Sequence, residues 1–185
     1  IIPGKNTISI SKRGGTSLHV SAMAEYINRS DHFAQKNLGI ALSRDYYRID
    51  ATRDGDIMKI KKNRTSSFSP GDLVMVELHA ERKVNDSRYV MLTDPIPPGF
   101  SFVMKDGEYY SSDLPREYLQ RMAYDDRAVF FFNQNGDETT VRYFLRAEIP
   151  GNYRCLPSSA ALMYYPDVTG STTDTTVTIE QKGGK

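Results

Sequence analysis

The chain contains no tryptophan, a single cysteine and no apolar run near the roughly 20 residues that a membrane-spanning helix needs. The one cysteine, Cys155, excludes an internal disulfide framework and a zinc site built from several cysteines. Neither sign of charge is in excess, because 24 Lys and Arg residues stand beside 23 Asp and Glu residues and give a net charge of +1. We therefore expect no nucleic-acid partner.

Patterns typical of catalysis and metal binding are also missing. His19, His32 and His79 have no carboxylate or second histidine at the spacing of metal ligands. No serine lies in a nucleophile elbow, and no glycine-rich phosphate loop is present. Asp125 and Asp126 lack further oxygen ligands at fixed offsets, so we interpret them as a solvated turn. We expect a protein that is not an enzyme and that holds no cofactor.

Alternation of apolar and polar residues is the main structural signal. In residues 72–81, Val74, Val76 and Leu78 share one face, and in residues 139–149 Val141 and Tyr143 do the same. Further strands are predicted at 39–49, 57–61, 88–93, 128–133 and 172–181, with Asp-Gly, Pro-Gly and Asn-Gly turn signals between several of them. The sequence therefore predicts an all-β fold, an antiparallel β-sandwich with at most one short helix.

The one predicted helix covers residues 113–124, with Asp113 as its N-cap and Pro115 in its first turn; an extended course for residues 122–127 is the alternative. Near the N-terminus, Gly14 and Gly15 predict a hairpin between residues 6–11 and 18–26. Residues 28–37 are polar without a period, which indicates a linker. Because the first residue is isoleucine and no leader pattern follows, we expect an excised piece of a longer chain.

The stretch 149–170 cannot be one regular element, because prolines remove backbone donors at positions 150, 157 and 166. Between two of these prolines lies the apolar run 160–165, which is too short for a secure helix. This segment is either a crossover that fills the core or a shaped contact surface. Cys155, with no histidine near it in sequence, is expected to pack as a small apolar side chain.

Two weaker patterns have a structural or accidental explanation. Asn28, Asn63 and Asn85 begin triplets that match the glycosylation sequon, which matters only in a eukaryotic secretory pathway. The tyrosine pairs 46–47 and 109–110 are compatible with a carbohydrate-binding platform. Because the chain has no tryptophan, we interpret these tyrosines as structural.

Three stretches together resemble the C-terminal macroglobulin-like domain of bacterial alpha-2-macroglobulins. They are Gly39-Ile-Ala-Leu-Ser-Arg-Asp-Tyr-Tyr-Arg-Ile49, Tyr89-Val-Met-Leu-Thr-Asp-Pro-Ile-Pro-Pro-Gly-Phe100, and Arg142-Tyr-Phe-Leu-Arg-Ala-Glu-Ile-Pro-Gly-Asn-Tyr153 with Leu156-Pro157 and Met163-Tyr164 beyond it. Their order and spacing across about 150 residues fit one domain. Two positions depart from the family pattern: Ser158 stands where a second proline is common, and Leu162 stands where an acidic residue often occurs.

The resemblance implies a macroglobulin-like, immunoglobulin-like sandwich at residues 37–185, preceded at 1–36 by the last strands of a CUB-like domain and a linker. It implies a non-catalytic part of a broad-spectrum protease trap, with the thioester and CUB-like domains of the same chain as partners and target proteases met through the full-length protein. The expected location is the periplasm or cell envelope, or outside the cell, and lipid anchoring of the parent is left open. The Cys-Gly-Glu-Gln thioester motif is absent, so a thioester would lie in another domain.

In related thioester proteins, aromatic and Met side chains of this domain cover the thioester until activation. Met163 and Tyr164 match that motif, and Tyr165 is an addition. We therefore expect Met163, Tyr164 and Tyr165 to form an interdomain contact, with Met163 and Tyr164 exposed here and Leu156 and Leu162 directed inward. The alternative function is an extracellular adhesion or carbohydrate-binding sandwich. A hydrolase has no motif to support it.

Overall fold

The computed structural model describes residues 6–15, 17–21, 32–54, 57–82, 89–111, 113–133 and 138–181. The chain divides into two units, Ile1–Ser30 and Asp31–Lys185. In the first unit the described residues contain no strand, so the predicted hairpin is wrong there, although Gly14 has the positive φ (119°) of the expected turn. The predicted second strand beyond residue 21 lies outside the described residues. The assignment of residues 1–36 to a CUB-like domain stays a prediction.

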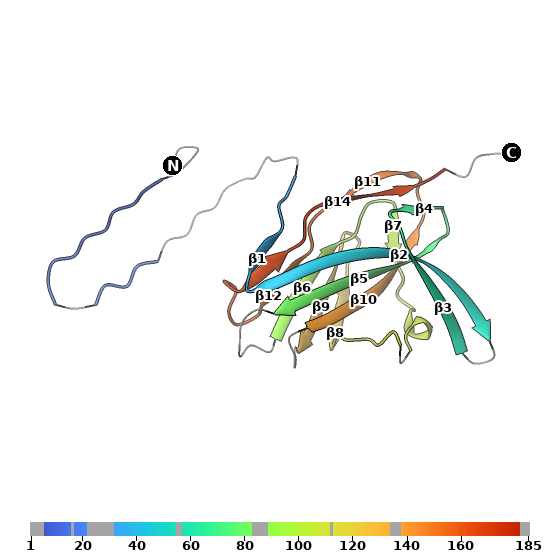
Figure 1. Cartoon of the computed structure of the whole chain (residues 1–185), viewed down its shortest axis with the longest axis horizontal. Coiled ribbons are helices and arrows are strands. Elements are labelled where there is room, and N and C mark those ends of the chain that lie inside the picture. Colours follow the sequence, from blue (N-terminus) through green and yellow to red (C-terminus); the bar gives the residue numbers. More distant parts are fainter. Residues whose placement is uncertain are drawn as a thin grey trace. The chain divides into compact units, whose positions relative to one another are not determined.

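The second unit is built from three sheets, and Figure 1 labels most of their strands. The six-stranded sheet has the order β1 (Lys36–Leu38), β13 (Thr169–Ser171), β12 (Ser159–Leu162), β6 (Tyr89–Pro95), β9 (Arg127–Asn133) and β8 (Gln120–Ala123). The five-stranded sheet has the order β3 (Ile57–Arg64), β2 (Ile40–Asp54), β5 (Leu73–Arg82), β10 (Glu138–Ala147) and β7 (Phe100–Phe102). The three-stranded sheet has the order β11 (Gly151–Cys155), β14 (Thr175–Ile179) and β4 (Ser67–Phe68).

Pairing between the named strands is antiparallel, except that β14 and β4 run parallel. One 3-10 turn, η1 (Gly107–Tyr109), is the helical element of the described residues, and these residues contain no helix long and apolar enough to cross a membrane. The prediction of an all-β antiparallel sandwich with at most one short helix is confirmed.

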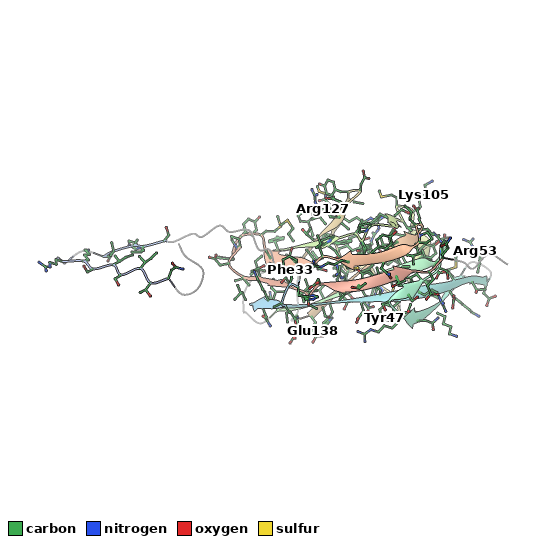
Figure 2. The ribbon with its side chains drawn as sticks, turned by 90° about the horizontal axis from the view of Figure 1, so that it is seen from above. Phe33, Tyr47, Arg53, Lys105, Arg127 and Glu138 are labelled. Carbon is green, nitrogen blue, oxygen red and sulfur yellow. The ribbon has the colours of Figure 1, made fainter. Side chains whose placement is uncertain are left out.

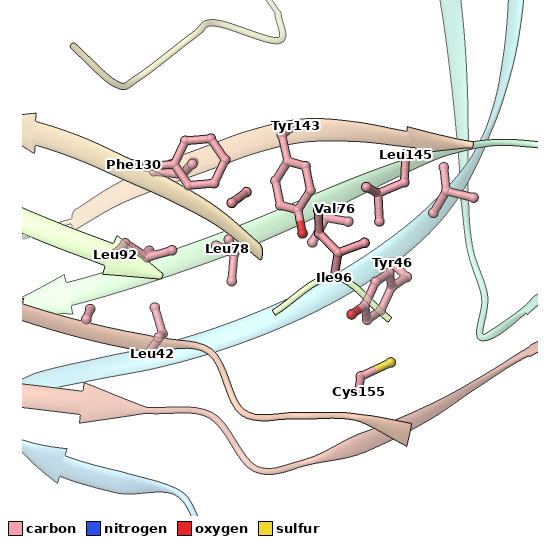
Figure 3. Packing of buried hydrophobic residues seen from close by; sticks show 14 of the residues in the cluster. Leu42, Tyr46, Val76, Leu78, Leu92, Ile96, Phe130, Tyr143, Leu145 and Cys155 are labelled. Atoms are coloured by element: carbon pink, nitrogen blue, oxygen red, sulfur yellow. The ribbon is translucent and has the colours of Figure 1, made fainter. Parts of the chain in front are cut away.

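One apolar core lies between the sheets, and inward residues of all three contribute to it. The predicted inward faces are buried: Val74, Val76 and Leu78 of β5 face the interior, as do Tyr143 and Leu145 of β10. Figure 3 shows Val76, Leu78, Tyr143 and Leu145 converging with Leu42, Leu92 and Phe130 from other strands. Strict alternation therefore located the core correctly, because successive strand side chains point to opposite faces.

A second, smaller cluster lies on the opposite face of the five-stranded sheet. Met75 of β5 and Phe144 of β10, which pair in register, are fully buried there. They are covered by the segment that follows β7, whose Tyr109 and Tyr110 rings lie 5.0 and 5.5 Å from the Phe144 ring. A cover of this kind comes from tertiary packing, so alternation within β5 and β10 does not reveal it.

The helix predicted at residues 113–124 is wrong. Residues 113–119 are irregular and lead into β8, which pairs with β9 along the edge of the six-stranded sheet. The partial apolar stripe was misread: Tyr118 packs against the Phe130 ring at 5.2 Å, whereas Leu119 is exposed. The extended alternative for the end of this segment holds for Met122 and Ala123, the last residues of β8. Sheet pairing has overridden a weak local preference.

Residues 149–170 form a crossover between sheets, in which the prolines separate three short strands. β11 pairs with β14 in the three-stranded sheet, whereas β12 lies inside the six-stranded sheet between β13 and β6. Pro157 stands between β11 and β12, and Pro166 stands in the turn between β12 and β13. Leu162 is buried as predicted, but Leu156 is 49% exposed, so its predicted inward orientation is wrong. Its place in the linker after β11, outside either sheet, explains the exposure.

Phe33, which Figure 2 labels, lies near the start of the second unit. We call the segment around Phe33 the strap, because hydrogen bonds tie it to residues 173 and 174 between β13 and β14. The Phe33 N–H donates to Asp174 Oδ1 at 2.8 Å, and Thr173 Oγ1 donates to the Phe33 carbonyl at 2.8 Å. The Arg154 guanidinium lies 5.3 Å from the centre of the Phe33 ring and also pairs with Asp174 at 3.0 Å. The hydrogen bond from the Phe33 amide, followed by the charge of Arg154, lowers the pKa of Asp174 to about 2.

Because the pKa of Asp174 is lowered, we predict that the strap detaches from Asp174 when this carboxylate is protonated at low pH. Because the folded pKa lies below the ordinary 3.8, the stabilisation is fully present above pH 4 and is lost as pH falls through about 2. In an NMR titration, the Phe33 amide shift should therefore report a midpoint near 2. A midpoint close to 3.8, or the same titration in an Asp174→Asn variant, would contradict the assignment.

At Gly170 of β13, we predict that adding a single methyl group lowers the stability of the fold strongly. A Cβ at this position would lie 1.9 Å from the carbonyl oxygen of Ile40, which is main chain and cannot rotate away. Gly170→Ala should therefore destabilise the fold by about 3 kcal/mol or more, measured by urea unfolding. Gly107→Ala is the matched control, since its Cβ would meet nothing within 4 Å, and should change stability by less than about 1 kcal/mol. Equal effects of the two variants would contradict this account.

Candidate functional site

Met163, Tyr164 and Tyr165 follow β12 on the turn that leads to β13. They are 49%, 73% and 63% exposed, so the predicted exposure of Met163 and Tyr164 is confirmed. The turn is internally bonded: Tyr165 N donates to the Leu162 carbonyl at 3.3 Å, and Val168 N donates to the Tyr165 carbonyl at 2.9 Å. These large apolar side chains therefore reach solvent on a structured turn, which limits the entropy lost when a partner covers them.

The turn continues into the outer face of the six-stranded sheet. The Tyr164 ring contacts the Tyr89 ring edge-on, with centroids 5.8 Å apart, and Met163 N donates to the Tyr89 carbonyl at 2.9 Å. By strand alternation and register, Arg127 of β9 and Lys36 of β1 also face outward, at the margins of this sheet, but the outward residues nearer Tyr89 are uncharged. They are Tyr89, Met91, Thr93, Gln120, Met122, Val129, Phe131, Asn133, Ser159 and Ala161. We call this set, with residues 163–165, the Met-Tyr surface.

The outer face of the five-stranded sheet has the opposite character. Asp45, Glu77 and Arg142 occupy outward positions there, and Arg142 Nε pairs with Glu77 at 2.8 Å. The outer face of the five-stranded sheet thus carries charged residues beside the second apolar cluster, whereas the outer face of the six-stranded sheet is largely uncharged and carries methionine and tyrosine. Depletion of charge together with Met and Tyr is typical of the buried centre of protein–protein interfaces. Such a surface can exclude water from whatever it covers.

A buried polar cluster lies at the other end of the same strands. Asp94 is completely buried, and its Oδ1 accepts from Arg44 Nη1 at 2.6 Å and from Ser158 Oγ at 2.7 Å. Its Oδ2 accepts from the Tyr143 hydroxyl at 2.7 Å. Asp94 belongs to the six-stranded sheet, Arg44 and Tyr143 to the five-stranded sheet, and Ser158 directly precedes β12. The cluster therefore joins the two layers from inside.

The three-stranded sheet also reaches this cluster. Arg44 Nη2 donates to the Cys155 carbonyl at 3.4 Å, at the end of β11. Figure 3 shows the hydroxyl of Tyr46 directed toward the Cys155 side chain, and the hydroxyl of Tyr143 directed between the layers. Cys155 is buried in the core, as predicted for a small apolar residue. Two buried polar atoms near it, Arg44 Nε and Tyr46 Oη, have no hydrogen-bond partner within the described residues.

The electrostatics of the cluster follow from burial and from the ion pair. Burial lowers the pKa of Arg44, but Asp94 and neighbouring groups outweigh it, so the net pKa shift is upward and the guanidinium stays charged. Burial is the main reason that the pKa values of Tyr46, Tyr143 and Cys155 are raised. The phenols and the thiol are therefore neutral at physiological pH, and a protonated buried thiol is a poor nucleophile.

Most other residues singled out in the sequence do not come together. His19 lies in the first unit, while His32 and His79 contact Asp174 at 3.4 Å and Glu138 at 3.8 Å respectively. Among the described residues, no group of three His, Cys, Asp or Glu side chains is arranged to hold a metal. Asp126 pairs with the adjacent Arg127 at 3.0 Å at the surface, in agreement with a solvated turn.

The tyrosine pairs are structural, as interpreted from the sequence. Tyr46 is buried in the main core, and Tyr47, Tyr109 and Tyr110 pack against the second cluster. They form no exposed aromatic platform, which removes the observation behind a carbohydrate-binding module. Of the sequon residues, Asn63 donates to Asp50 at 3.2 Å on the β2–β3 hairpin, whereas Asn28 and Asn85 lie outside the described residues.

Sequence reasoning did not single out the buried polar cluster, although a signal for it was present. Arg44 stands in phase with Ile40, Leu42 and Tyr46, and Asp94 stands in phase with Val90 and Leu92. A charged residue in the inward phase of a strand must find an opposite charge, because an unpaired buried charge is strongly unfavourable. The two charges have opposite signs, so the pairing could have been proposed from phase alone.

Comparison with known proteins agrees with the resemblance of the three stretches. A family model described as the Bacterial Alpha-2-macroglobulin MG10 domain matches residues 39–167, which contain all three. Two structures of alpha-2-macroglobulin from Escherichia coli share the fold. The native protein from domain MG7 to the C-terminus has a TM-score of 0.62 and 18% identity, and the match covers 79% of this chain and 24% of that chain. The native conformation determined by cryo-EM has a TM-score of 0.63 and 18% identity, and the match covers 82% of this chain and 10% of that chain. Salmonella alpha-2-macroglobulin reacted with methylamine is also similar, with a TM-score of 0.60 and 20% identity, and the match covers 79% of this chain and 9% of that chain.

The chain thus spans about a quarter or less of the length of these structures. No curated protein matches it.

The buried cluster predicts that removing its negative charge destabilises the fold much more than removing a negative charge from an exposed ion pair. Asp94→Asn leaves the Arg44 charge buried without an anion and should destabilise the fold by about 3–5 kcal/mol, measured by urea unfolding. Asp54→Asn, which breaks the exposed pair with Lys59, is the matched control and should cost less than about 1 kcal/mol. A loss below about 1 kcal/mol for Asp94→Asn would mean that the cluster does not hold the sheets together.

Proposed function

This chain belongs to the bacterial alpha-2-macroglobulin MG10 domain family, and from that membership we propose that it is a non-catalytic domain of a broad-spectrum protease-trapping inhibitor. In this proposal the domain shields the thioester of another domain of the same chain until a protease cleaves the bait region. The parent protein acts in the periplasm or cell envelope. Its partners are the thioester and CUB-like domains of the same chain and, through the full-length protein, target proteases.

The observation that carries the proposal is the exposure of Met163, Tyr164 and Tyr165 on an ordered turn next to the uncharged outward residues of β6 and β12. A thioester hydrolyses when water or another nucleophile reaches it, so an apolar cover preserves it. Methionine adapts to an irregular surface, and tyrosine combines a large apolar area with one polar group. Covering each such side chain is worth about 1.5–3 kcal/mol, which is enough to hold a cover that a domain rearrangement can still remove.

The electrostatics of the domain agree with a shielding role rather than a chemical one. The residues of the Met-Tyr surface are uncharged and Arg127 and Lys36 lie at its margins, so covering these residues requires no charge to be desolvated. The buried Cys155 and the phenols beside it have raised pKa values and stay protonated. The adhesion or carbohydrate-binding alternative receives no comparable support, because the tyrosine pairs that suggested it are packed.

The test replaces Met163 and Tyr164 with alanine in the full-length protein. If the two side chains cover the thioester, the uncleaved double variant should react with methylamine at least about tenfold faster, the effect of losing roughly 1.4 kcal/mol of protection. Leu119→Ala is the matched control, because Leu119 is also apolar and 74% exposed but directly precedes β8, an edge strand that β6 and β9 separate from β12. Unchanged methylamine reactivity of the double variant, or an equal rise in the reactivity of the control, would contradict the shielding role.

A further inference from the structure

The strand that carries the exposed turn has a doubled sequence. Residues 158–165 read Ser-Ser-Ala-Ala-Leu-Met-Tyr-Tyr, which is four successive pairs of identical or similar residues. In the structure the first member of the first three pairs points inward: Ser158, Ala160 and Leu162 are all buried. The second members, Ser159, Ala161 and Met163, are partly or largely exposed. Both faces of β12 therefore have almost the same chemistry.

A slip by one residue exchanges the two faces, because strand side chains alternate with a period of two. Ser159 would then take the place of Ser158 and donate its hydroxyl to Asp94, and Ala161 would take the place of Ala160. Met163 would enter the core site of Leu162, an exchange of nearly equal volume that cores tolerate well. The inward pattern of serine, alanine and a large aliphatic side chain is preserved.

The slip is possible in one direction only. Moving the strand the other way would bring Ala161 to the site of Leu162 and leave a cavity there. It would also bring Pro157 to the site of Ser158, where the N–H donates to Thr172 Oγ1 at 3.0 Å and the hydroxyl donates to Asp94. Proline has neither donor, so two buried hydrogen bonds would be lost.

The strands on either side of β12 are held in place. On one side, Gly170 fixes β13 against β2, because any side chain brought to this position would collide with the Ile40 carbonyl. On the other side, Asp94 fixes β6 through its ion pair with Arg44. Both ends of β12 can accommodate the change: the linker before it contains the exposed Leu156, and the turn 163–168 would shorten by one residue. Thus β12 can shift alone between fixed neighbours.

We propose that β12 is a register switch that presents Met163 at the surface in one state and withdraws it into the core in the other. The inference rests on the proposed shielding function, since withdrawal of Met163 would remove part of the cover from the thioester. The structure holds the presenting state. Passing to the other state breaks the hydrogen bonds of β12 with β6 and β13, so the exchange requires local unfolding and is slow. A partner that binds Met163 selects the presenting state, and its departure frees the switch.

Two glutamate substitutions on adjacent residues test the switch in this 185-residue chain. Ala160 is buried in the observed register and would face outward after the slip, whereas Ala161 does the reverse. Ala160→Glu should therefore fold in the slipped register, because a charged side chain moves to the exposed position. Ala161→Glu should fold in the observed register and be locked there. The control is Ala147→Glu in β10, where a slip would bury Arg142 and Arg146, so this variant should not fold.

The readout is oxidation of Met163 by hydrogen peroxide, followed by mass spectrometry with exposed Met104 as the internal reference. In Ala160→Glu the Met163 rate should fall at least about tenfold relative to Met104, since a buried methionine is oxidised only through local opening. In Ala161→Glu it should match the unsubstituted chain. The switch is overturned if Ala160→Glu unfolds as Ala147→Glu does, or if it folds with Met163 still oxidised at the original rate.

This experiment does not depend on a thioester, so the two proposals can fail separately. Burial of Met163 in Ala160→Glu together with unchanged methylamine reactivity of the Met163 and Tyr164 double variant supports the switch and rejects the shielding role. Faster methylamine reaction of the double variant together with unfolding of Ala160→Glu supports the shielding role and rejects the switch.

Discussion

The ion pair between Arg44 and Asp94 is the constraint on which the arrangement of the three sheets depends. Both side chains are removed from water, so each needs the other to offset the unfavourable burial of its charge. Asp94 also accepts from Tyr143 and Ser158, and Arg44 reaches the end of β11. Three sheets whose apolar faces could slide over one another are thereby fixed at one point, because a charge-assisted hydrogen bond has a defined direction.

Ser158 connects this constraint to the surface. A proline is common at this position in the resembled family, yet here the serine uses both groups that proline lacks: its N–H donates to Thr172 and its hydroxyl donates to Asp94. Five residues further along the chain, Met163 leaves β12 and the Met-Tyr surface begins. The buried cluster and the exposed turn are thus two ends of one short strand, and the position of that strand decides which side chains reach a partner.

Several elements were predictable because they depend on local periodicity. The inward faces of β5 and β10, the all-β class and the exposure of Met163 and Tyr164 were predicted from alternation and from the resemblance of short stretches. The segment 113–124 and Leu156 were predicted wrongly, since both lie where the chain leaves one strand and enters another. There the backbone direction is set by partners distant in sequence, such as β9 for β8.

The sequence by itself therefore determined the class of fold, the inward faces of the long strands and the family. Each of these depends on the spacing of residues a few positions apart or on contiguous motifs. Only the tertiary structure decided that Arg44, Asp94 and Tyr143 meet, since 50 and 49 residues separate the donors from Asp94 and no local rule fixes such a contact. It also decided the register of β12. The doubled sequence of residues 158–165 satisfies the core in either of two registers, so only the packing of that strand between β6 and β13 shows which one is occupied.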